Sequence, residues 1–358
     1  MDLVKKDCAE IIKTDAVIIG AGPVGLFQVF ELGLLDIKTH VIETLDQAGG
    51  QCSELYPDKP IYDIPALPSV NAQELTERLL QQISPFDPVF HFGHEVVSLE
   101  RLNEDWFEVK TQRGLVLHSR AVIIAAGMGA FRPVRLKVSE FEKFENKSVF
   151  YKVKNLEAHR GRDVVVLGGG DSALDWALGL QPIANSVTLI HRSSKFRAAP
   201  ATVNKMFQLC DQFKIQCLIG AVSGFEQDVK GDLKVIKVTA ADNVTRTLEL
   251  DDLLVFFGLS PKLGSISEWG MELHKNQIVV DTQYFQTSQL GIYAVGDINV
   301  YPGKKKLILS GFHEAALAAF AVKERLQPEK KVHLQYTTTS PILHQRLQVD
   351  DPYGGEAA

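Results

Sequence analysis

The chain has 358 residues, of which 45% are hydrophobic and 23% charged, and its formal net charge is −6. This length predicts two or three domains, the acidic balance argues against general nucleic-acid binding, and no apolar run approaches the roughly 20 residues that span a membrane. Charged residues interrupt the opening segment MDLVKKDCAEIIKTDAVIIG, which therefore lacks a signal peptide's hydrophobic region, so we expect a cytoplasmic protein.

A first nucleotide-binding pattern begins near the amino terminus. The short apolar run Ala16–Ile19 is typical of a buried parallel strand, and Gly20, Gly22 and Gly25 follow it in G-x-G-x-x-G spacing. A helix pattern opens at these glycines, and the next strand, THVIE, ends at Glu43. Because a carboxylate there accepts hydrogen bonds from ribose hydroxyls and repels a 2′-phosphate, the pattern predicts FAD or NAD rather than NADP.

A second nucleotide-binding pattern follows after the buried strand AVIIAAG, residues 121–127. The apolar run Val164–Leu167 predicts a strand, and Gly168, Gly170 and Ala173 give the spacing G-x-G-x-x-A. Residues 171–180 have a helix pattern. Two such units in one chain distinguish it from a simple dehydrogenase, which needs only one.

The second pattern lacks an acid at the ribose position. Its next strand, SVTLIHR, ends at His191 and Arg192, and Lys195 and Arg197 follow. Fixed positive charge is what a 2′-phosphate needs, so this site predicts NADP, with a solvated basic turn as the alternative. One FAD-like and one NADP-like unit together indicate hydride transfer from NADPH to a flavin.

The remaining chain carries two strand-plus-turn patterns, DDLLVFFGLSP and GIYAVGD, and then the helix pattern SGFHEAALAAFAVKERL. We expect the last 30 or so residues to form a tail with short irregular structure. The four cysteines, Cys8, Cys52, Cys210 and Cys217, form no CxxC and match no metal-ligand spacing. We therefore expect structural thiols and no metal site.

Several segments together resemble the two-dinucleotide flavoprotein disulfide reductase superfamily, and most closely the thioredoxin reductases: IIGAGPVGL, VIE, GGQ, GGGDSALDWALGL, HRSSKFRA and GIYAVGDI. The resemblance implies an α/β fold with two Rossmann-like (ββα-type) dinucleotide-binding domains, the NADP domain being inserted into a discontinuous FAD domain. The implied boundaries are 1–127 for the first part of the FAD domain, 128–254 for the NADP domain, 255–325 for the second part of the FAD domain, and 326–358 for a C-terminal extension.

Neither disulfide relay of this superfamily is complete. Thioredoxin reductases carry CxxC before the second glycine pattern, where this chain reads KSVFYKVKNLEAHRGRDVVVLGGG without a cysteine. The glutathione reductase branch carries GG-x-C-x4-C, of which Cys52 fills the first cysteine position and Pro57 the second. The chain therefore resembles the ferredoxin–NADP⁺ reductases of the thioredoxin-reductase-like type, with which it shares GGQ-x4-YP.

This resemblance implies an FAD- and NADP(H)-dependent enzyme that passes electrons to or from a ferredoxin or flavodoxin. A hydride moves to flavin N5 and single electrons then leave, without a cysteine relay or a catalytic side chain. The implied FAD contacts are Gly20, Gly22, Pro23, Gly25, Glu43, Gln51, Tyr56, Val96, Phe131, Asp297, Tyr336 and Thr338. The implied NADP contacts are Gly168, Gly170, Asp171, Ser172, Ala173, His191, Arg192 and Arg197.

The C-terminal extension of this family covers the flavin of the partner subunit in a homodimer. Tyr56 and Tyr336 are accordingly expected to stack on opposite flavin faces. Which of Thr337, Thr338 and Thr339 contacts FAD is left open. Val96 and Phe131, taken without the resemblance, are typical core residues.

Two other functions stay open: an NADPH-dependent disulfide reductase that pairs Cys52 with a non-motif cysteine such as Cys8, and a low-turnover NADPH–flavin sensor. A monooxygenase of similar layout is disfavoured because no FxGxxxHxxxW/F fingerprint lies between the glycine patterns. An acidic reductase needs a local basic patch to dock an acidic ferredoxin. The run Lys304–Lys306 is our candidate, with a solvated lysine run as the alternative.

Overall fold

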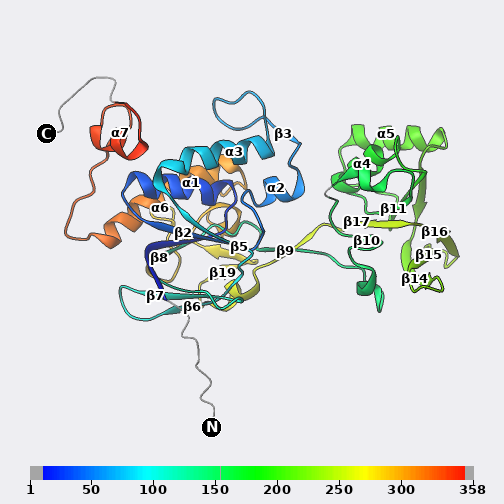
Figure 1. The fold of residues 1–358 in the computed structure, drawn as a ribbon, viewed down its shortest axis with the longest axis horizontal. Coiled ribbons are helices and arrows are strands. Elements are labelled where there is room, and N and C mark those ends of the chain that lie inside the picture. Colours follow the sequence, from blue (N-terminus) through cyan, green and yellow to red (C-terminus); the bar gives the residue numbers. More distant parts are fainter. Residues whose placement is uncertain (1–10, 154, 351–358) are drawn as a thin grey trace, which may run out of the picture. The chain divides into compact units, whose positions relative to one another are not determined.

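The computed structural model describes residues 11–153 and 155–350, with only the backbone described for residues 130–133 and 259–262. The chain divides into two compact units (Figure 1): unit 1 is Met1–Ala130 with Pro261–Ala358, and unit 2 is Phe131–Ser260. It passes between them in β9 (Ala130–Pro133) and β18 (Leu259–Lys262), which pair with each other. In the described ranges, every helix is too short or too polar to cross a bilayer.

A seven-stranded sheet forms the centre of unit 1. Its strands are β1 (Ile12–Ile19), β2 (Thr39–Glu43), β5 (Val89–Phe92), β6 (Val96–Arg101), β7 (Phe107–Thr111), β8 (Val116–Ile124) and β21 (Ile292–Ala294). The order is β5-β2-β1-β8-β7-β6, and β21 also pairs with β8. Strands β5, β2, β1, β8 and β21 run parallel, whereas β7 and β6 are antiparallel additions.

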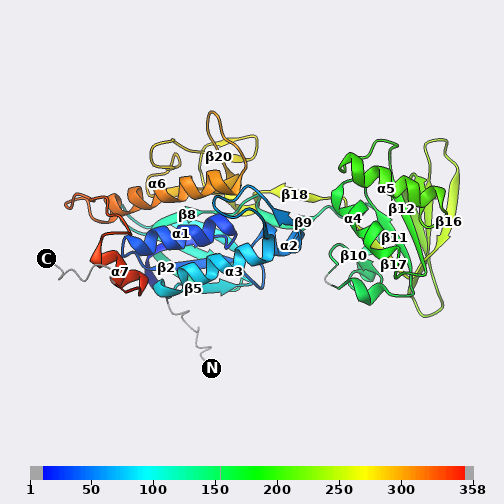
Figure 2. The same ribbon diagram turned by 90° about the horizontal axis from the view of Figure 1, so that it is seen from above.

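Three helices cover one face of this sheet, and α1 lies between the other two (Figure 2). They are α1 (Pro23–Leu34), α3 (Ala72–Ile83) and α6 (Ile308–Leu326). The shorter elements of the unit are α2 (Gln51–Leu55), α7 (Pro341–Leu347), β3 (Pro60–Ile61), β4 (Val70–Asn71), β19 (Leu273–His274), β20 (Gln277–Val279), β22 (Asn299–Val300), η1 (Ser84–Phe86), η4 (Gly264–Glu268) and η5 (Gly296–Ile298).

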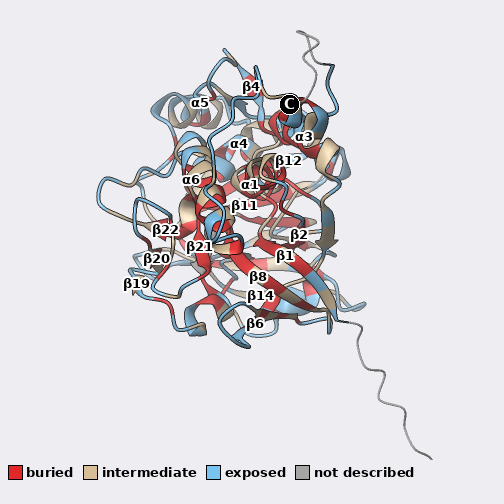
Figure 3. Ribbon diagram, turned by 90° about the vertical axis from the view of Figure 1, so that its left-hand side faces the viewer, coloured by how far each residue is buried: buried red, intermediate tan, exposed pale blue. Residues whose placement is uncertain are grey.

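The central strands of unit 1 are apolar because neighbours cover them on all sides. Ala16, Val17 and Ile18 are fully buried, as are residues 121–124 of β8, and Figure 3 shows this burial along both strands. The predicted strand Ala16–Ile19 is confirmed, but β1 starts earlier, at Ile12, where it already pairs with β8. At its carboxyl end, β1 stops at Ile19 and the first glycine turn follows directly at Gly20.

Unit 2 is built on a parallel sheet of order β10-β17-β11-β12-β13. Its strands are β10 (Val149–Phe150), β11 (Asp163–Leu167), β12 (Ser186–His191), β13 (Gln216–Ile219) and β17 (Asp252–Val255). The other elements are α4 (Asp171–Leu180), α5 (Pro200–Asp211), β14 (Ala221–Gln227), β15 (Leu233–Thr239), β16 (Thr245–Glu249), η2 (Phe141–Phe144) and η3 (Leu156–His159).

Alternation along β11 shows how both faces of the unit 2 sheet are covered. Val164 and Val166 pack with residues of α4 and α5, whereas Val165 and Leu167 pack with residues of the antiparallel sheet β14-β15-β16. Helices thus pack on the parallel sheets of both units, as expected for Rossmann-like domains. The predicted α/β fold with two such domains is confirmed.

Two short helices were not predicted from the sequence. The segment after Gly50 forms the helix α2, closed by a bond from the Glu54 amide to the Gly50 carbonyl at 3.0 Å. The C-terminal tail contains the helix α7, whose start is capped by Ser340 and followed by Pro341 at the first helical position. This Ser-Pro pair was a readable helix-start signal.

Candidate functional site

The first glycine turn lies between β1 and α1. A side chain at Gly20, where φ is +108°, would come 2.5 Å from the carbonyl oxygen of Ala125, and one at Gly25 would come 2.0 Å from the Gly20 carbonyl. Gly22 precedes α1, Pro23 is its first residue, and no side chain caps this helix end. The first turn of α1 therefore presents uncapped backbone donors that fit a dinucleotide pyrophosphate.

Glu43 lies at the end of β2, beside this turn. Its side chain is only 6% exposed, and its Oε2 accepts a hydrogen bond from the Ala21 amide at 2.7 Å. Its Oε1 accepts from the Leu45 amide and the Thr44 hydroxyl, each at 3.0 Å. These bonds fix the carboxylate where the predicted ribose acceptor should lie.

The GGQ segment packs against the same turn. Gly50 has φ +54°, and a side chain there would come 3.1 Å from the Cα of Gly22. The Nε2 atom of Gln51 lies beside Gly127, 3.5 Å from where a side chain at that glycine would begin. Three separate parts of the sequence thus meet around Gly22, as the predicted FAD contacts require.

Tyr56 lies next to Cys52. The Cys52 thiol, 1% exposed, donates to the Tyr56 hydroxyl at 3.9 Å, and burial raises the pKa of both groups. The negative charges of Asp297 and Asp63 raise the pKa of Tyr56 further. The phenol therefore stays protonated, and the charge of Asp297, which is distant in sequence, acts on it.

Asp297 belongs to the turn η5. Its carboxylate makes no hydrogen bond to any other residue that the structure describes. The backbone carbonyl of Asp297 accepts a bond from Gln277 Nε2 at 3.1 Å. The main chain is thus held while the carboxylate stays available to a ligand.

For Val96 and Phe131, the described structure gives little information about the predicted contact with FAD. Val96 begins β6, is 5% exposed, and its carbonyl accepts a bond from Ser265 Oγ at 2.7 Å, so this carbonyl is engaged within the chain. Phe131 lies in β9, and its side chain is outside the described part of the structure.

Tyr336 and Thr338 lie away from the glycine turn of their own chain. Both are exposed, as are Thr337 and Thr339, so burial does not distinguish the three threonines. The Thr337 carbonyl bonds to His344 Nε2 of α7 at 2.6 Å. This segment is therefore tied to α7.

The helix α7 is in turn fixed to the far end of α1. Arg346 donates to the carbonyl of Leu34, the last residue of α1, and pairs with Asp36 at 3.5 Å. Gln348 adds a bond to the Pro85 carbonyl at 3.2 Å. Figures 1 and 2 show α7 and α2 at opposite ends of α1, which is about 18 Å long by its helical rise.

The second glycine turn lies between β11 and α4. Gly168 has φ +147°, and a side chain there would come 2.5 Å from the Phe256 carbonyl and 2.8 Å from the Cβ of Ala173. Ala173 is fully buried, whereas Ser172 is exposed. Gly170 precedes α4 and no side chain caps this helix end, so it too fits a pyrophosphate.

The segment after β12 folds back over this turn. The Arg197 amide bonds to the Gly169 carbonyl at 2.7 Å, and the Ala199 amide bonds to Asp171 Oδ1 at 2.9 Å. One oxygen of Asp171 is therefore engaged at the start of α5. The fold-back brings the basic residues of this segment to the second glycine turn.

His191 and the basic side chains occupy the edge of the second turn. Burial lowers the pKa of His191, and its ring lies 5.2 Å from that of Phe196. Arg192, Lys195 and Arg197 are exposed, and no ion pair joins them to other described residues. Their charges are free for an anion such as a 2′-phosphate.

Lys304 does not belong to a docking patch, and this part of the prediction is wrong. Its side chain is 5% exposed and its Nζ forms an ion pair with fully buried Glu314. Lys305 and Lys306 are exposed. Sequence reasoning also missed Glu314, although a lone acid in the apolar helix SGFHEAALAAF was a signal for a buried polar group.

The described cysteines, Cys52, Cys210 and Cys217, are free thiols, and Cys8 lies outside the described residues. Burial raises the pKa of Cys210, and raises that of Cys217 to about 11. Within the described ranges, no group of three or more His, Cys, Asp or Glu side chains is placed to hold a metal ion.

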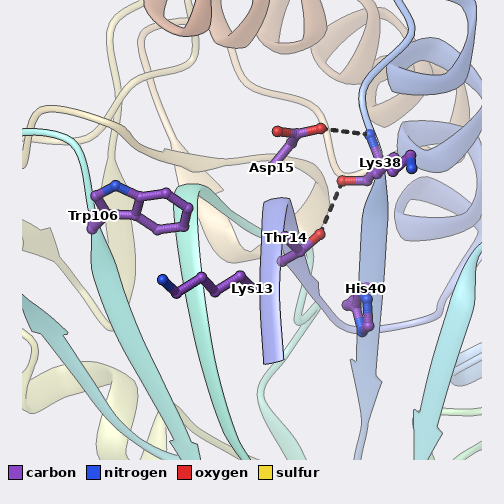
Figure 4. A pocket seen from close by; sticks show the side chains of 6 residues that line it. All are labelled: Lys13, Thr14, Asp15, Lys38, His40 and Trp106. Atoms are coloured by element: carbon purple, nitrogen blue, oxygen red, sulfur yellow. Dashed lines mark hydrogen bonds between the residues drawn. The ribbon is translucent and has the colours of Figure 1, made fainter. Parts of the chain in front are cut away.

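A shallow pocket lies at the end of the unit 1 sheet that is opposite to the first glycine turn (Figure 4). Its lining residues are Lys13, Thr14, Asp15, Lys38, His40 and Trp106. Thr14 and Asp15 bond to the backbone of Lys38 at 3.2 and 3.3 Å. The pocket lies at the amino ends of β1 and β2, whereas Gly20 and Glu43 lie at their carboxyl ends, so it is separate from the nucleotide site.

Comparisons with known proteins show the family of the chain. Residues 14–323 match the family described as pyridine nucleotide-disulphide oxidoreductase. "Ferredoxin--NADP reductase 2" of Cupriavidus taiwanensis is 60% identical over 341 residues, which cover 95% of this chain and 92% of that protein. "Ferredoxin--NADP reductase" of Colwellia psychrerythraea is 57% identical over 339 residues, which cover 95% of this chain and 97% of that protein.

Solved structures share the fold at lower identity. Thioredoxin reductase of Lactococcus lactis has a TM-score of 0.70 and 23% identity, covering 88% of this chain and 99% of its own. The bacillithiol disulfide reductase of Staphylococcus aureus has a TM-score of 0.71 and 18% identity, covering 89% and 100%.

Proposed function

The chain belongs to the ferredoxin–NADP reductases of the pyridine nucleotide-disulphide oxidoreductase family, and we propose that it moves electrons between NADPH and a ferredoxin or flavodoxin. It is an oxidoreductase with FAD and NADP(H) as cofactors. Bound FAD supplies hydride acceptance from NADPH and release of single electrons. The protein's own task is to bind and orient these groups.

One contrast between the two glycine turns carries the proposal. The unit 1 turn is followed by the buried carboxylate of Glu43, whereas the unit 2 turn is followed by Arg192 and Arg197, whose charges are unpaired within the described residues. A carboxylate orients ribose hydroxyls and a pair of guanidinium groups holds a 2′-phosphate. Unit 1 is therefore proposed to hold FAD and unit 2 NADPH.

In unit 1, α1 would bind the pyrophosphate through its first turn, and Gln51 and Tyr56 would lie beside the flavin. Tyr56 keeps its proton because burial raises the pKa of its phenol, so it acts as a hydrogen-bond donor and a stacking surface. Asp297 would bind the ribityl or pyrophosphate end through its available carboxylate.

Electron transfer without a thiol relay is supported by the state of the cysteines. Cys52 is 1% exposed and burial raises the pKa of its thiol, whereas exchange with a disulfide requires an accessible thiolate. Its contact with the Tyr56 hydroxyl gives it a packing role instead. A disulfide reductase would be favoured only by NADPH-dependent gain of two thiols per subunit.

A homodimer is supported by where α7 holds the extension. Thr337 is bonded to α7, and α7 is fixed at the end of α1 opposite to Gly22, so the segment of Tyr336 is held away from the glycine turn of its own chain. We therefore assign Tyr336 to the flavin of a second copy. If Tyr336→Ser leaves both flavin reduction by NADPH and the nicotinamide complex unchanged in stopped-flow spectra, Tyr336 has no such role.

Anaerobic titration with NADPH, with and without a ferredoxin, tests the function directly. We expect flavin bleaching on addition of NADPH and rapid return of the oxidised spectrum with ferredoxin, without new thiols. Slow bleaching with no preference for ferredoxin over dyes would favour a sensor. Two new thiols per subunit would favour the disulfide reductase.

The docking patch narrows to Lys305 and Lys306, followed by the exposed Leu307 and Leu309. Two exposed charges beside apolar side chains fit an acidic carrier protein. Lys305→Gln/Lys306→Gln should slow ferredoxin reduction and flatten its salt dependence. The matched control is Lys330→Gln/Lys331→Gln, a second exposed lysine pair of unit 1, and equal salt profiles in both variants would refute this docking surface.

A further inference from the structure

Glu314 is a fully buried carboxylate in the second turn of α6. Its Oε2 accepts bonds from the Gly296 amide at 2.7 Å and from Asn299 Nδ2 at 2.9 Å. Its Oε1 accepts from the Tyr301 hydroxyl at 2.9 Å and from Lys304 Nζ. All four donors belong to residues 296–304, the segment that begins with η5. One carboxylate therefore holds this segment against α6 by hydrogen bonds.

Lys304 completes the arrangement from the other side. Its Nζ donates to the Gly296 carbonyl at 2.9 Å as well as to Glu314, and its side chain is 5% exposed. Both backbone polar groups of Gly296 are therefore bonded to the two members of one buried ion pair. Gly296 has φ +80°, so the pair fixes a residue whose conformation favours glycine.

The fixed turn touches the first turn of α1. A side chain at Gly296 would come 3.4 Å from Val24 Cγ2, and one at Gly311 of α6 would come 2.3 Å from the same atom. Val24 lies two residues after Gly22, within the pyrophosphate-binding turn. The ion pair therefore lies behind the place where α1, η5 and the start of α6 converge.

Burial of two charges is a poor way to gain stability. Desolvation offsets most of the attraction in a buried pair, and apolar residues of similar volume often serve stability equally well. Burial and the Glu314 charge also raise the pKa of Tyr301 to about 12, so that its hydroxyl remains a donor to the carboxylate. In this network each carboxylate oxygen of Glu314 accepts two hydrogen bonds, and only the Oδ1 of Asn299 lacks a partner among the described residues, so the network is suited to fixing one geometry.

We propose that Lys304 and Glu314 are positioning residues for the FAD site, which fix η5 so that Asp297 meets the cofactor. The inference rests on the proposed function only in taking FAD as the ligand of unit 1. Neither residue touches the cofactor in this account. They act through the Gly296 backbone.

The test uses Lys304→Met/Glu314→Leu, which removes both charges and leaves neither buried alone. Three quantities are measured on purified holoprotein: FAD dissociation by flavin fluorescence, the visible flavin spectrum and the flavin midpoint potential. We expect the FAD dissociation constant to rise about tenfold or more, with shifts in the spectrum and the potential.

Asp252→Asn in unit 2 is the matched control. Asp252 is 1% exposed and its Oδ2 bonds to His159 and Arg162, each at 2.8 Å, so the control weakens a buried network that belongs to the other unit. It should lower thermal stability and leave all three flavin measurements unchanged.

Unchanged flavin affinity, spectrum and potential in the double variant would overturn the inference and leave the pair a purely structural one. If the double variant does not fold, Glu314→Gln decides by the same three measurements, because it keeps the side-chain volume and removes the charge. A wild-type protein that binds no FAD would refute the proposed function instead, so the two failures are distinguishable.

Discussion

Replacement of Glu43 by glutamine tests the first nucleotide site at its most constrained side chain. The carboxylate accepts from the Ala21 amide at 2.7 Å through one oxygen and from the Leu45 amide at 3.0 Å through the other. A glutamine amide has one oxygen, so its nitrogen must face one of these two donors. The variant therefore leaves one backbone amide of a buried turn without an acceptor.

The expected magnitude follows from this lost bond. An unsatisfied buried donor destabilises by about 1–3 kcal/mol, which corresponds to a fall in melting temperature of roughly 2–12 °C for a domain of this size. Loss of the charged acceptor for the ribose should also weaken FAD binding about 10- to 100-fold. The loss of FAD affinity does not depend on the loss of stability, so we expect it even if the melting temperature of the FAD-free protein falls only slightly.

Two assays separate these effects: thermal unfolding of FAD-free protein and titration with FAD followed by flavin fluorescence. Glu31→Gln is the control, because Glu31 is a half-buried acid of α1 that lies outside the glycine turn. It should leave FAD affinity unchanged. Wild-type FAD affinity in Glu43→Gln would refute the assignment of Glu43 to the ribose.

Three further outcomes are expected. Burial raises the pKa of Glu31 to about 7 from a usual value of 4.5, so the folded state holds the proton more tightly than the unfolded state. The free energy of unfolding should therefore fall as the pH rises from about 4.5 to 7. Thermal unfolding of the Glu31→Gln variant should lack this pH dependence. Cys52→Ala should lose about 1 kcal/mol of stability and retain electron transfer to ferredoxin, and loss of transfer with FAD still bound would revive a thiol role. Arg192→Gln/Arg197→Gln should raise the Michaelis constant for NADPH at least about tenfold and change that for NADH by less than about twofold; equal effects on both coenzymes would contradict a 2′-phosphate site.

Local patterns in the sequence were sufficient for the two nucleotide folds. The helix α4 begins and ends where the pattern placed it, at Asp171 and Leu180, and β2 ends at Glu43 as expected. These predictions succeed because strand, glycine turn and helix are contiguous, and close packing demands particular residues at fixed spacing. The contrast between an acid and basic residues at the strand ends is equally local.

The tertiary structure decided what distant segments do to one another. Lys304 belongs to an exposed-looking lysine run, yet it is buried against Glu314 because α6 folds over the turn that precedes it. The charge of Asp297 acts on Tyr56, and α7 ties the extension to the far end of α1, through contacts that exist only in the tertiary structure. The sequence by itself determined the two cofactor-binding folds, since their signals are local spacings; burial, pairing and the direction of the C-terminal extension depend on contacts between remote segments, which no local spacing encodes.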